Sequence, residues 1–110
     1  MVQYSVLDVS FAALSDPTRR GILHRLGEGR ATVSELAEKF EMTLTGMRKH
    51  IQLLEQADLV VTEKHGRTRY CELSRNSLDR ELAWIDAYRS MVNARMDRLE
   101  EFLNRTETKS

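Results

Sequence analysis

The feature that most constrains the fold lies in residues 33–56, where two helical patterns are separated by only two residues. The later pattern has apolar residues spaced by three, four and three positions, which share one face of a helix over 43–56. These residues are Leu44, Met47, Ile51 and Leu54. Thr32 and Glu35 have the spacing of a capping box, which predicts a short earlier helix over 33–40. Two short helices joined so tightly predict a helix-turn-helix.

The polar side chains of the segment 43–56 fall on a different face from the apolar ones. They are Thr45, Arg48, Lys49 and Gln52, and Thr43 can cap the start of the helix. Side chains of these types can donate hydrogen bonds to phosphates, to guanine O6/N7 or to adenine, as a helix in a DNA major groove requires. An isolated segment of this kind is more often an ordinary solvated surface helix, so the rest of the chain has to decide.

A basic β-hairpin is predicted directly after the helix-turn-helix. Residues 59–63 and 68–73 are strand-like, and Gly66 supplies the turn between them. The tip, over 63–70, carries Lys64, His65, Arg67 and Arg69 against the single acid Glu63. A hairpin in this position is a wing, and a basic wing can follow DNA phosphates or enter a minor groove.

The sequence predicts helices near both ends of the chain, with more apolar surface than a small core can cover. Tyr4, Leu7, Phe11 and Leu14 form one helical stripe, and Asp16 and Pro17 start a second helix that ends at Gly27 or Gly29. A long helix is predicted over about 77–103, with an apolar seam that only Arg89 interrupts. So small a core cannot cover this seam, which predicts a two-fold dimer. The expected interface residues are Leu7, Phe11, Leu82, Ile85, Val92, Met96 and Leu99.

Length and charge fit one small DNA-reading domain. The 110 residues predict a single domain over 1–110, with a core over 9–73 and a frayed tail over 104–110. The formal net charge is zero, but the segments 43–52 and 63–70 each carry two net positive charges. The long helix has six acids against four bases, so positive charge concentrates on the proposed reading edge. No membrane-spanning run or secretion signal is present, and the single Cys71 fits a reducing cytoplasm.

Catalytic and metal-binding patterns are absent from the sequence. No nucleophile with a base, Gly-rich phosphate loop or metal-ligand spacing occurs, so we expect no enzyme activity, cofactor or metal site. His24, His50 and His65 lie on three different predicted elements. Cys71 has no second cysteine to resolve a redox reaction, which favours an apolar filler over a thiol sensor, although an intermolecular disulfide stays open.

The assembled order of elements resembles the ArsR-type winged-helix transcriptional repressors over about residues 9–103. The motifs that carry the resemblance are LSDPTRR at 14–20, TVSELA at 32–37, KHI at 49–51 and GRTRY at 66–70. The resemblance implies a homodimer that represses transcription from an inverted-repeat operator. It places Thr43, Thr45, Arg48, Lys49 and His50 at the major groove, and Lys64, Arg67 and Arg69 at the wing. The Cys-x-Cys pair with which many members sense metals is missing from 33–38, and the last helix has no His.

Two residues depart from the family pattern. Arg48 stands where a small polar residue is usual. It could read a guanine, which is worth roughly 1–3 kcal/mol of discrimination, or only contact a phosphate. Gly46 stands where Ala or Thr is usual and costs about 1 kcal/mol in a helix. The operator sequence therefore cannot be transferred from relatives.

The sequence thus predicts a mostly α winged helix-turn-helix with a small β-hairpin and a dimer interface built by its first and last helices. The expected function is sequence-specific regulation of transcription, with double-stranded DNA and a second copy of the chain as partners. The sequence does not identify a small-molecule inducer, and no membrane partner is expected. The alternative is a winged-helix module that binds protein, which would more often carry apolar or acidic residues on the face that is basic here.

Overall fold

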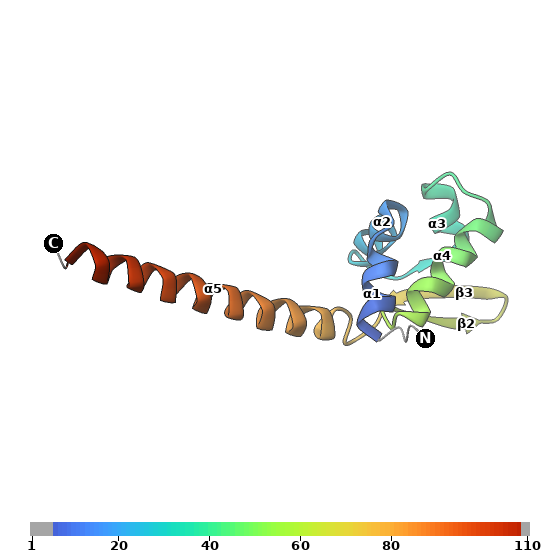
Figure 1. Cartoon of the computed structure of the whole chain (residues 1–110). Helices are drawn as coiled ribbons and strands as arrows, with labels where there is room; N and C mark the ends of the chain where they lie inside the picture. Colours follow the sequence, from blue (N-terminus) through green and yellow to red (C-terminus); the bar gives the residue numbers. More distant parts are fainter. Residues whose placement is uncertain (1–5, 109–110) are drawn as a thin grey trace, which may run out of the picture. The chain divides into compact units, whose positions relative to one another are not determined.

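The computed structural model describes residues 6–108 (Figure 1). It divides into two compact units, one ending at Leu78 and one beginning at Asp79. The first unit contains α1 (Val6–Leu14), α2 (Pro17–Leu26), β1 (Ala31–Thr32), α3 (Val33–Lys39), α4 (Leu44–Gln56), β2 (Val60–His65) and β3 (Thr68–Leu73). The second unit is α5 (Asp79–Thr108). The predicted fold class, a mostly α winged helix-turn-helix, is confirmed.

Three of the helices start at the side-chain caps that the sequence predicts. The carboxylate of Asp16 accepts a hydrogen bond from the backbone N–H of Arg19 at 3.0 Å. The hydroxyls of Thr32 and Thr43 accept from the third residue after each, also at 3.0 Å. Each bond satisfies a backbone donor that has no partner within its helix, which fixes where α2, α3 and α4 begin.

The turn of the helix-turn-helix is closed by backbone hydrogen bonds. Glu41 has a positive φ of 53°, its N–H donates to Glu38 O at 3.2 Å, and the N–H of Met42 donates to Ala37 O at 2.8 Å. This pair of bonds is a Schellman motif, whose left-handed residue is usually glycine. The same arrangement ends α4, where Asp58 has a φ of 59° and the N–H of Leu59 donates to Leu54 O at 3.0 Å.

The hairpin belongs to a three-stranded antiparallel sheet with the order β1-β3-β2. In the hairpin, Lys64 pairs with Arg69 and His65 with Thr68, so the turn is the two-residue Gly66–Arg67. Gly66 has a φ of 64°, which a hairpin turn of this length favours. We did not predict β1, because a two-residue strand has no periodicity of its own and exists through its pairing with β3.

The core of the first unit lies where the four helices and the sheet meet. Its buried members are Ala13, Ile22, Leu26, Ala31, Val33, Leu36, Ala37, Met47, Ile51, Leu54, Ala57, Leu59, Val60 and Cys71. The helix α2 contributes Ile22 and Leu26 to this core, and α3 contributes Val33, Leu36 and Ala37. The prediction that Leu44 belongs to the buried face of α4 was wrong. Leu44 is 44% exposed, because the core does not extend to the first turn of this helix.

On α1, the fully buried residues are small, while Val9 and Leu14 are partly buried and pack against the core. Ser10 and Ala13 are buried, and the Ser10 hydroxyl donates to Val6 O at 3.0 Å and to Ala57 O at 3.4 Å. The small side chains let α1 approach the end of α4 closely. Leu7 and Phe11 are only partly buried on this helix, and Tyr4 of the predicted stripe lies outside the described residues.

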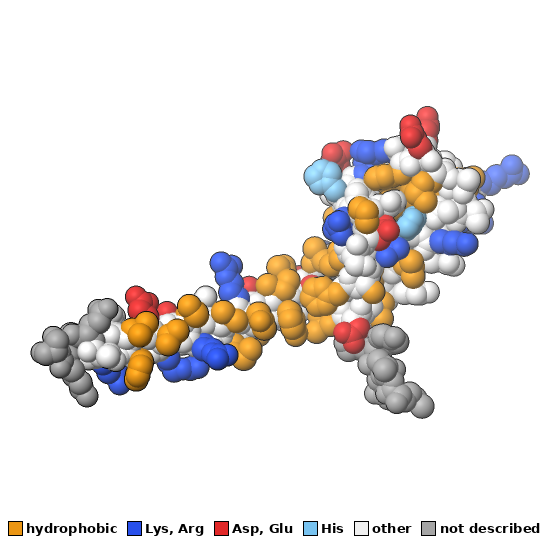
Figure 2. Space-filling view, turned by 45° about the horizontal axis from the view of Figure 1, so that its top comes forward, with side chains coloured by type: hydrophobic (Ala, Val, Ile, Leu, Met, Phe, Trp, Pro, Cys, Tyr) orange, Lys and Arg blue, Asp and Glu red, His pale blue; other side chains and the backbone are white. Residues whose placement is uncertain are grey.

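The second unit is one long helix with an unburied apolar surface. Its 30 residues make α5 about 45 Å long, and it continues to Thr108, past the expected end at 103 and into the segment that we expected to fray. Figure 2 shows hydrophobic side chains along this helix, interspersed with charged ones. The predicted seam residues Leu82, Ile85, Val92, Met96 and Leu99 are between 39% and 57% exposed. The described residues contain no helix long and apolar enough to cross a membrane.

Candidate nucleic-acid interface

The helix α4 is anchored on one face and free on the other. Met47, Ile51 and Leu54 are at most 2% exposed and hold the helix against the core. The predicted reading residues Thr45, Arg48, Lys49 and Gln52 are all exposed, as is the cap Thr43. Because the packed and exposed residues lie on different faces, the polar side chains are free to meet a ligand without disturbing the core.

A groove of about 870 Å³ lies between α4, the start of α3 and the hairpin. It is lined by Thr32, Val33, Ser34, Leu44, Arg48, Ile51, Gln52, Glu55, Lys64, Arg67, Thr68, Arg69 and Tyr70. Four of these side chains are cationic and only one, Glu55, is a carboxylate. The structure therefore brings Arg48 and Gln52 of α4 together with the predicted wing cations in one surface of positive charge.

One predicted wing residue also links the wing to α4. Arg69 Nη1 donates to the hydroxyl of Thr62 at 2.8 Å, and this hydroxyl donates to Glu55 Oε2 at 3.2 Å. The relay joins the two sides of the groove by side chains. Arg69 is therefore oriented by a partner, whereas no carboxylate within the described residues lies within 4.0 Å of Arg48, Lys64 or Arg67.

His50 differs from the other predicted reading residues, because the structure turns it away from the groove. Its Nδ1 lies 3.3 Å from Arg19 Nη1 and 4.0 Å from Asp16 Oδ2, and its side chain is 20% exposed. The Arg19 guanidinium in turn donates to Ala13 O at 2.8 Å and to Ala12 O at 3.2 Å. These bonds satisfy carbonyls at the end of α1, so His50 ties α4 to the junction of α1 and α2.

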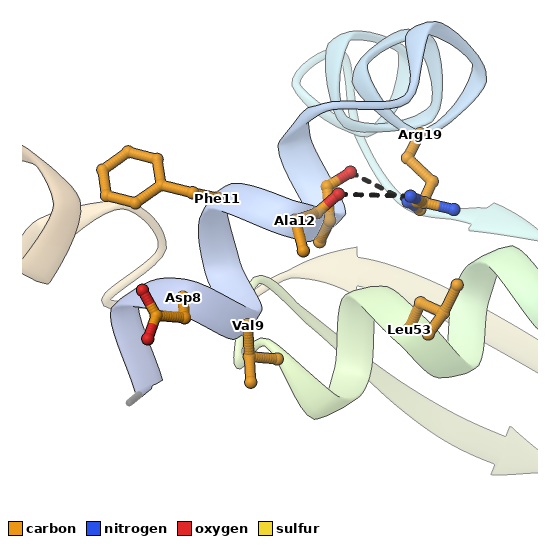
Figure 3. A pocket seen from close by; sticks show the side chains of 7 residues that line it. Asp8, Val9, Phe11, Ala12, Arg19 and Leu53 are labelled. Atoms are coloured by element: carbon orange, nitrogen blue, oxygen red, sulfur yellow. Dashed lines mark hydrogen bonds between the residues drawn. The ribbon is translucent and has the colours of Figure 1, made fainter. Parts of the chain in front are cut away.

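A second hollow lies where α1, Arg19 of α2 and Leu53 of α4 meet. Its volume is about 520 Å³, and it is lined by Asp8, Val9, Phe11, Ala12, Ala13, Arg19 and Leu53. Figure 3 shows Val9 and Leu53 on facing helices, while Phe11 points away from Leu53. Its dashed lines mark the hydrogen bonds from Arg19 to carbonyls at the C-terminal end of α1. Leu53 is 43% exposed there, so α4 has an apolar flank that the core does not cover.

The two unusual residues of α4 have different surroundings. Arg48 is exposed and lines the groove, where it can reach a ligand. A Cβ added at Gly46 would lie 3.2 Å from the capping oxygen of Thr43 and 3.3 Å from Met42 Cε. The absence of a side chain at Gly46 therefore leaves room for the Thr43 cap and for Met42 in the turn.

The titratable groups of the described residues form no cluster suited to a metal ion. No group of three or more His, Cys, Asp or Glu side chains comes together there. Cys71 is fully buried on β3, and this burial raises the pKa of its thiol to about 11, with the charge of Glu55 acting in the same direction. The thiol is therefore protonated near neutral pH, which is the opposite of what a reactive cysteine needs.

The sequence did not predict the interaction of Arg30 with the wing. Its guanidinium lies over the ring of Tyr70, with Cζ 4.3 Å from the ring centroid. His65 meets the edge of the same ring at a centroid distance of 5.7 Å and lies 3.5 Å from Glu63 Oε2. The spacing of Arg30 and Tyr70 in the chain gives no signal of this contact, because the pairing of β1 with β3 creates it.

Comparisons with known proteins agree with this architecture. The Helix-turn-helix domain family matches residues 14–63. The transcriptional repressor SdpR of Bacillus subtilis (strain 168) is 33% identical over 75 residues, which cover 68% of this chain and 83% of the relative. The arsenical resistance operon repressor of Staphylococcus xylosus is 31% identical over 78 residues, which cover 71% and 75% of the two chains.

A solved structure leads to the same class. The crystal structure of an ArsR family transcriptional regulator is 41% identical, with a TM-score of 0.76 over 84% of this chain and 97% of that chain. The fold and the basic groove thus define a DNA-binding transcriptional regulator of the winged helix-turn-helix class. The chain belongs to the ArsR family.

Proposed function

We propose that this protein is a homodimeric repressor that binds an inverted-repeat operator. The observation that carries the proposal is the groove between α4 and the wing, whose lining has four cationic side chains and one carboxylate. In this proposal α4 enters the major groove, and the wing lies on the backbone or in the minor groove. The similarity to SdpR, a transcriptional repressor, supports repression as the outcome of binding.

The exposed side chains of α4 and the wing have different roles in the proposal. Arg48 reads a base, because it is exposed on the reading face and its planar guanidinium matches guanine O6 and N7. Thr43, Thr45, Lys49 and Gln52 contact phosphates or neighbouring base edges. Lys64, Arg67 and Arg69 contact the backbone. His50 acts as a positioning residue through Arg19, a role supported by the 3.3 Å distance between His50 Nδ1 and Arg19 Nη1.

A second copy of the chain would cover the apolar side chains of α5. Large apolar surfaces exposed along a helix favour association, and Leu7 and Phe11 of α1 add to the available area. A two-fold dimer would present two copies of α4 about one turn of DNA apart, roughly 34 Å. Such a regulator acts where the DNA is, which implies a cytoplasmic location.

Selection of bound sequences from a random DNA duplex pool tests the proposal. The native protein should enrich an inverted repeat. Arg48→Ala should lose the preference at one position of each half-site, worth roughly 1–3 kcal/mol, whereas Arg67→Ala should bind every sequence more weakly with the same preferences. Arg75→Ala, at the base of the hairpin, is the matched control. Identical preference profiles for the Arg48 and Arg67 variants would contradict the assigned roles.

Failure of the native protein to enrich any sequence would instead favour the protein-binding alternative. The dimer is tested separately by sedimentation. Leu99→Gln should give monomers or insoluble protein, because it places an amide in the proposed apolar seam. Arg98→Gln changes the neighbouring position on the same helix and should leave the dimer intact. A well-folded Leu99→Gln dimer of native stability would remove α5 from the interface.

A further inference from the structure

Arg30 is an exposed cationic residue next to the wing. It is not one of the predicted reading residues. It comes immediately before β1, whose Ala31 and Thr32 pair with Cys71 and Tyr70 of β3. This pairing fixes the backbone of Arg30 beside β3, and its guanidinium stacks on Tyr70 with Cζ 4.3 Å from the ring centroid. Arg30 is exposed, while Tyr70 is partly buried. The Arg30 guanidinium is therefore held on one side by the Tyr70 ring and is open to solvent on the other.

The stacking arrangement leaves the guanidinium able to bind an anion. A guanidinium that lies on an aromatic face keeps its N–H donors directed outward in its own plane, in the fork that matches phosphate oxygens. Within the described residues, no carboxylate lies within 4.0 Å of Arg30. This contrasts with Arg25, which donates to Gly29 O and pairs with Glu35. The side chain is thus oriented and has no competing acid.

Tyr70 connects this cation to the basic groove. The ring on which Arg30 stacks also lines the groove, together with Arg67 and Arg69 of the same hairpin. Arg30 therefore continues the positive surface past the wing, on the side where β1 joins the sheet. It lies on none of the elements that reach base edges in the proposed complex. Its expected partner is consequently the sugar-phosphate backbone, which carries charge but little sequence information.

We propose that Arg30, held on the ring of Tyr70, binds a backbone phosphate of the operator beside the segment contacted by the wing. This inference rests on the proposed function. Arg30 adds affinity without sequence preference, and it fixes the angle at which the hairpin meets the duplex. Because the two protomers would be related by two-fold symmetry, the contact would occur once in each half-site.

The salt dependence of operator binding tests the inference. Each phosphate contact adds about 0.9 to the slope of log affinity against log salt concentration. Raising the salt from 50 to 200 mM weakens operator binding by both proteins. The loss of affinity should be smaller for Arg30→Ala than for the native protein, by a factor of about 3.5 per half-site. The sequence preference of this variant should be unchanged. Arg30→Lys should keep the native slope but bind more weakly, because it retains the charge and loses the planar fork.

Arg75→Ala is the matched control, since it removes one exposed arginine from the base of the same hairpin and should leave the slope unchanged. A native slope for Arg30→Ala, measured beside a reduced slope for Arg67→Ala, would overturn this inference and leave the proposed function standing. Loss of affinity at an unchanged slope would also overturn it, because it would mean that Arg30 only supports Tyr70. Absence of salt-dependent operator binding by the native protein would refute the proposed function itself.

Discussion

Replacement of Glu41 by glycine should stabilise the protein, because this residue closes the helix-turn-helix in a left-handed conformation. Its φ is 53°, and its N–H donates to Glu38 O within the Schellman motif. A residue with a Cβ costs roughly 1–2 kcal/mol in that conformation, and glycine avoids the cost. Glycine also gives the unfolded chain more freedom, which opposes the gain by about 0.4–1 kcal/mol. The net expectation is a stabilisation of about 0.5–1 kcal/mol.

Thermal unfolding at a fixed protein concentration measures this effect. For a domain of this size, 0.5–1 kcal/mol corresponds to a rise in Tm of about 2–8 °C. Glu38→Gly is the matched control, because it makes the same replacement three residues earlier, inside α3. It should cost up to about 1 kcal/mol, since glycine is unfavourable in a right-handed helix. A loss of stability in Glu41→Gly as large as that in the control would refute the left-handed assignment.

Two further predictions follow from titratable groups. The pKa of Asp16 lies below its usual value, chiefly because its carboxylate accepts the backbone N–H of Arg19, with the charges of Arg19 and His50 adding to the effect. A lowered pKa stabilises the fold above the unfolded value of about 3.9, and the contribution is lost as pH falls through the folded pKa. The excess stability of the native protein over Asp16→Asn, which keeps the cap, should therefore shrink as the pH falls below about 4; a difference that is the same at about pH 5 and about pH 2 would contradict this prediction. Burial raises the pKa of Cys71 to about 11, so iodoacetamide at pH 8 should react slowly with the native thiol and rapidly once the protein is unfolded. Equal rates in the two states would show that the thiol is accessible.

Local patterns predicted most of the first unit, and contacts distant in the chain account for what they missed. The caps at Asp16, Thr32 and Thr43 follow from residue type and spacing, and all three occur. The exposure of Leu44 was missed because helical spacing identifies a face but not how far along the helix the core extends. The strand β1 exists only through its partner, β3.

The same reasoning applies to the candidate site. The charges of Arg48, Lys64 and Arg67 can be assigned from sequence, because each lies on an element that the pattern places at the surface. His50 cannot, since its contact with Arg19 joins residues 31 positions apart. Arg30 was missed for the same reason, because its stacking on Tyr70 depends on the pairing of β1 with β3.

The separation of the two faces of α4 has a consequence for how such regulators diverge. Met47, Ile51 and Leu54 hold the helix, and its ends are fixed by the Thr43 cap and by backbone hydrogen bonds around Asp58. Apart from the Thr43 cap, none of these contacts involves an outward side chain. Substitutions at Thr45, Arg48, Lys49 or Gln52 should therefore alter operator preference at little cost in stability. After gene duplication, copies of such a chain could acquire new targets through a few outward changes while keeping one scaffold.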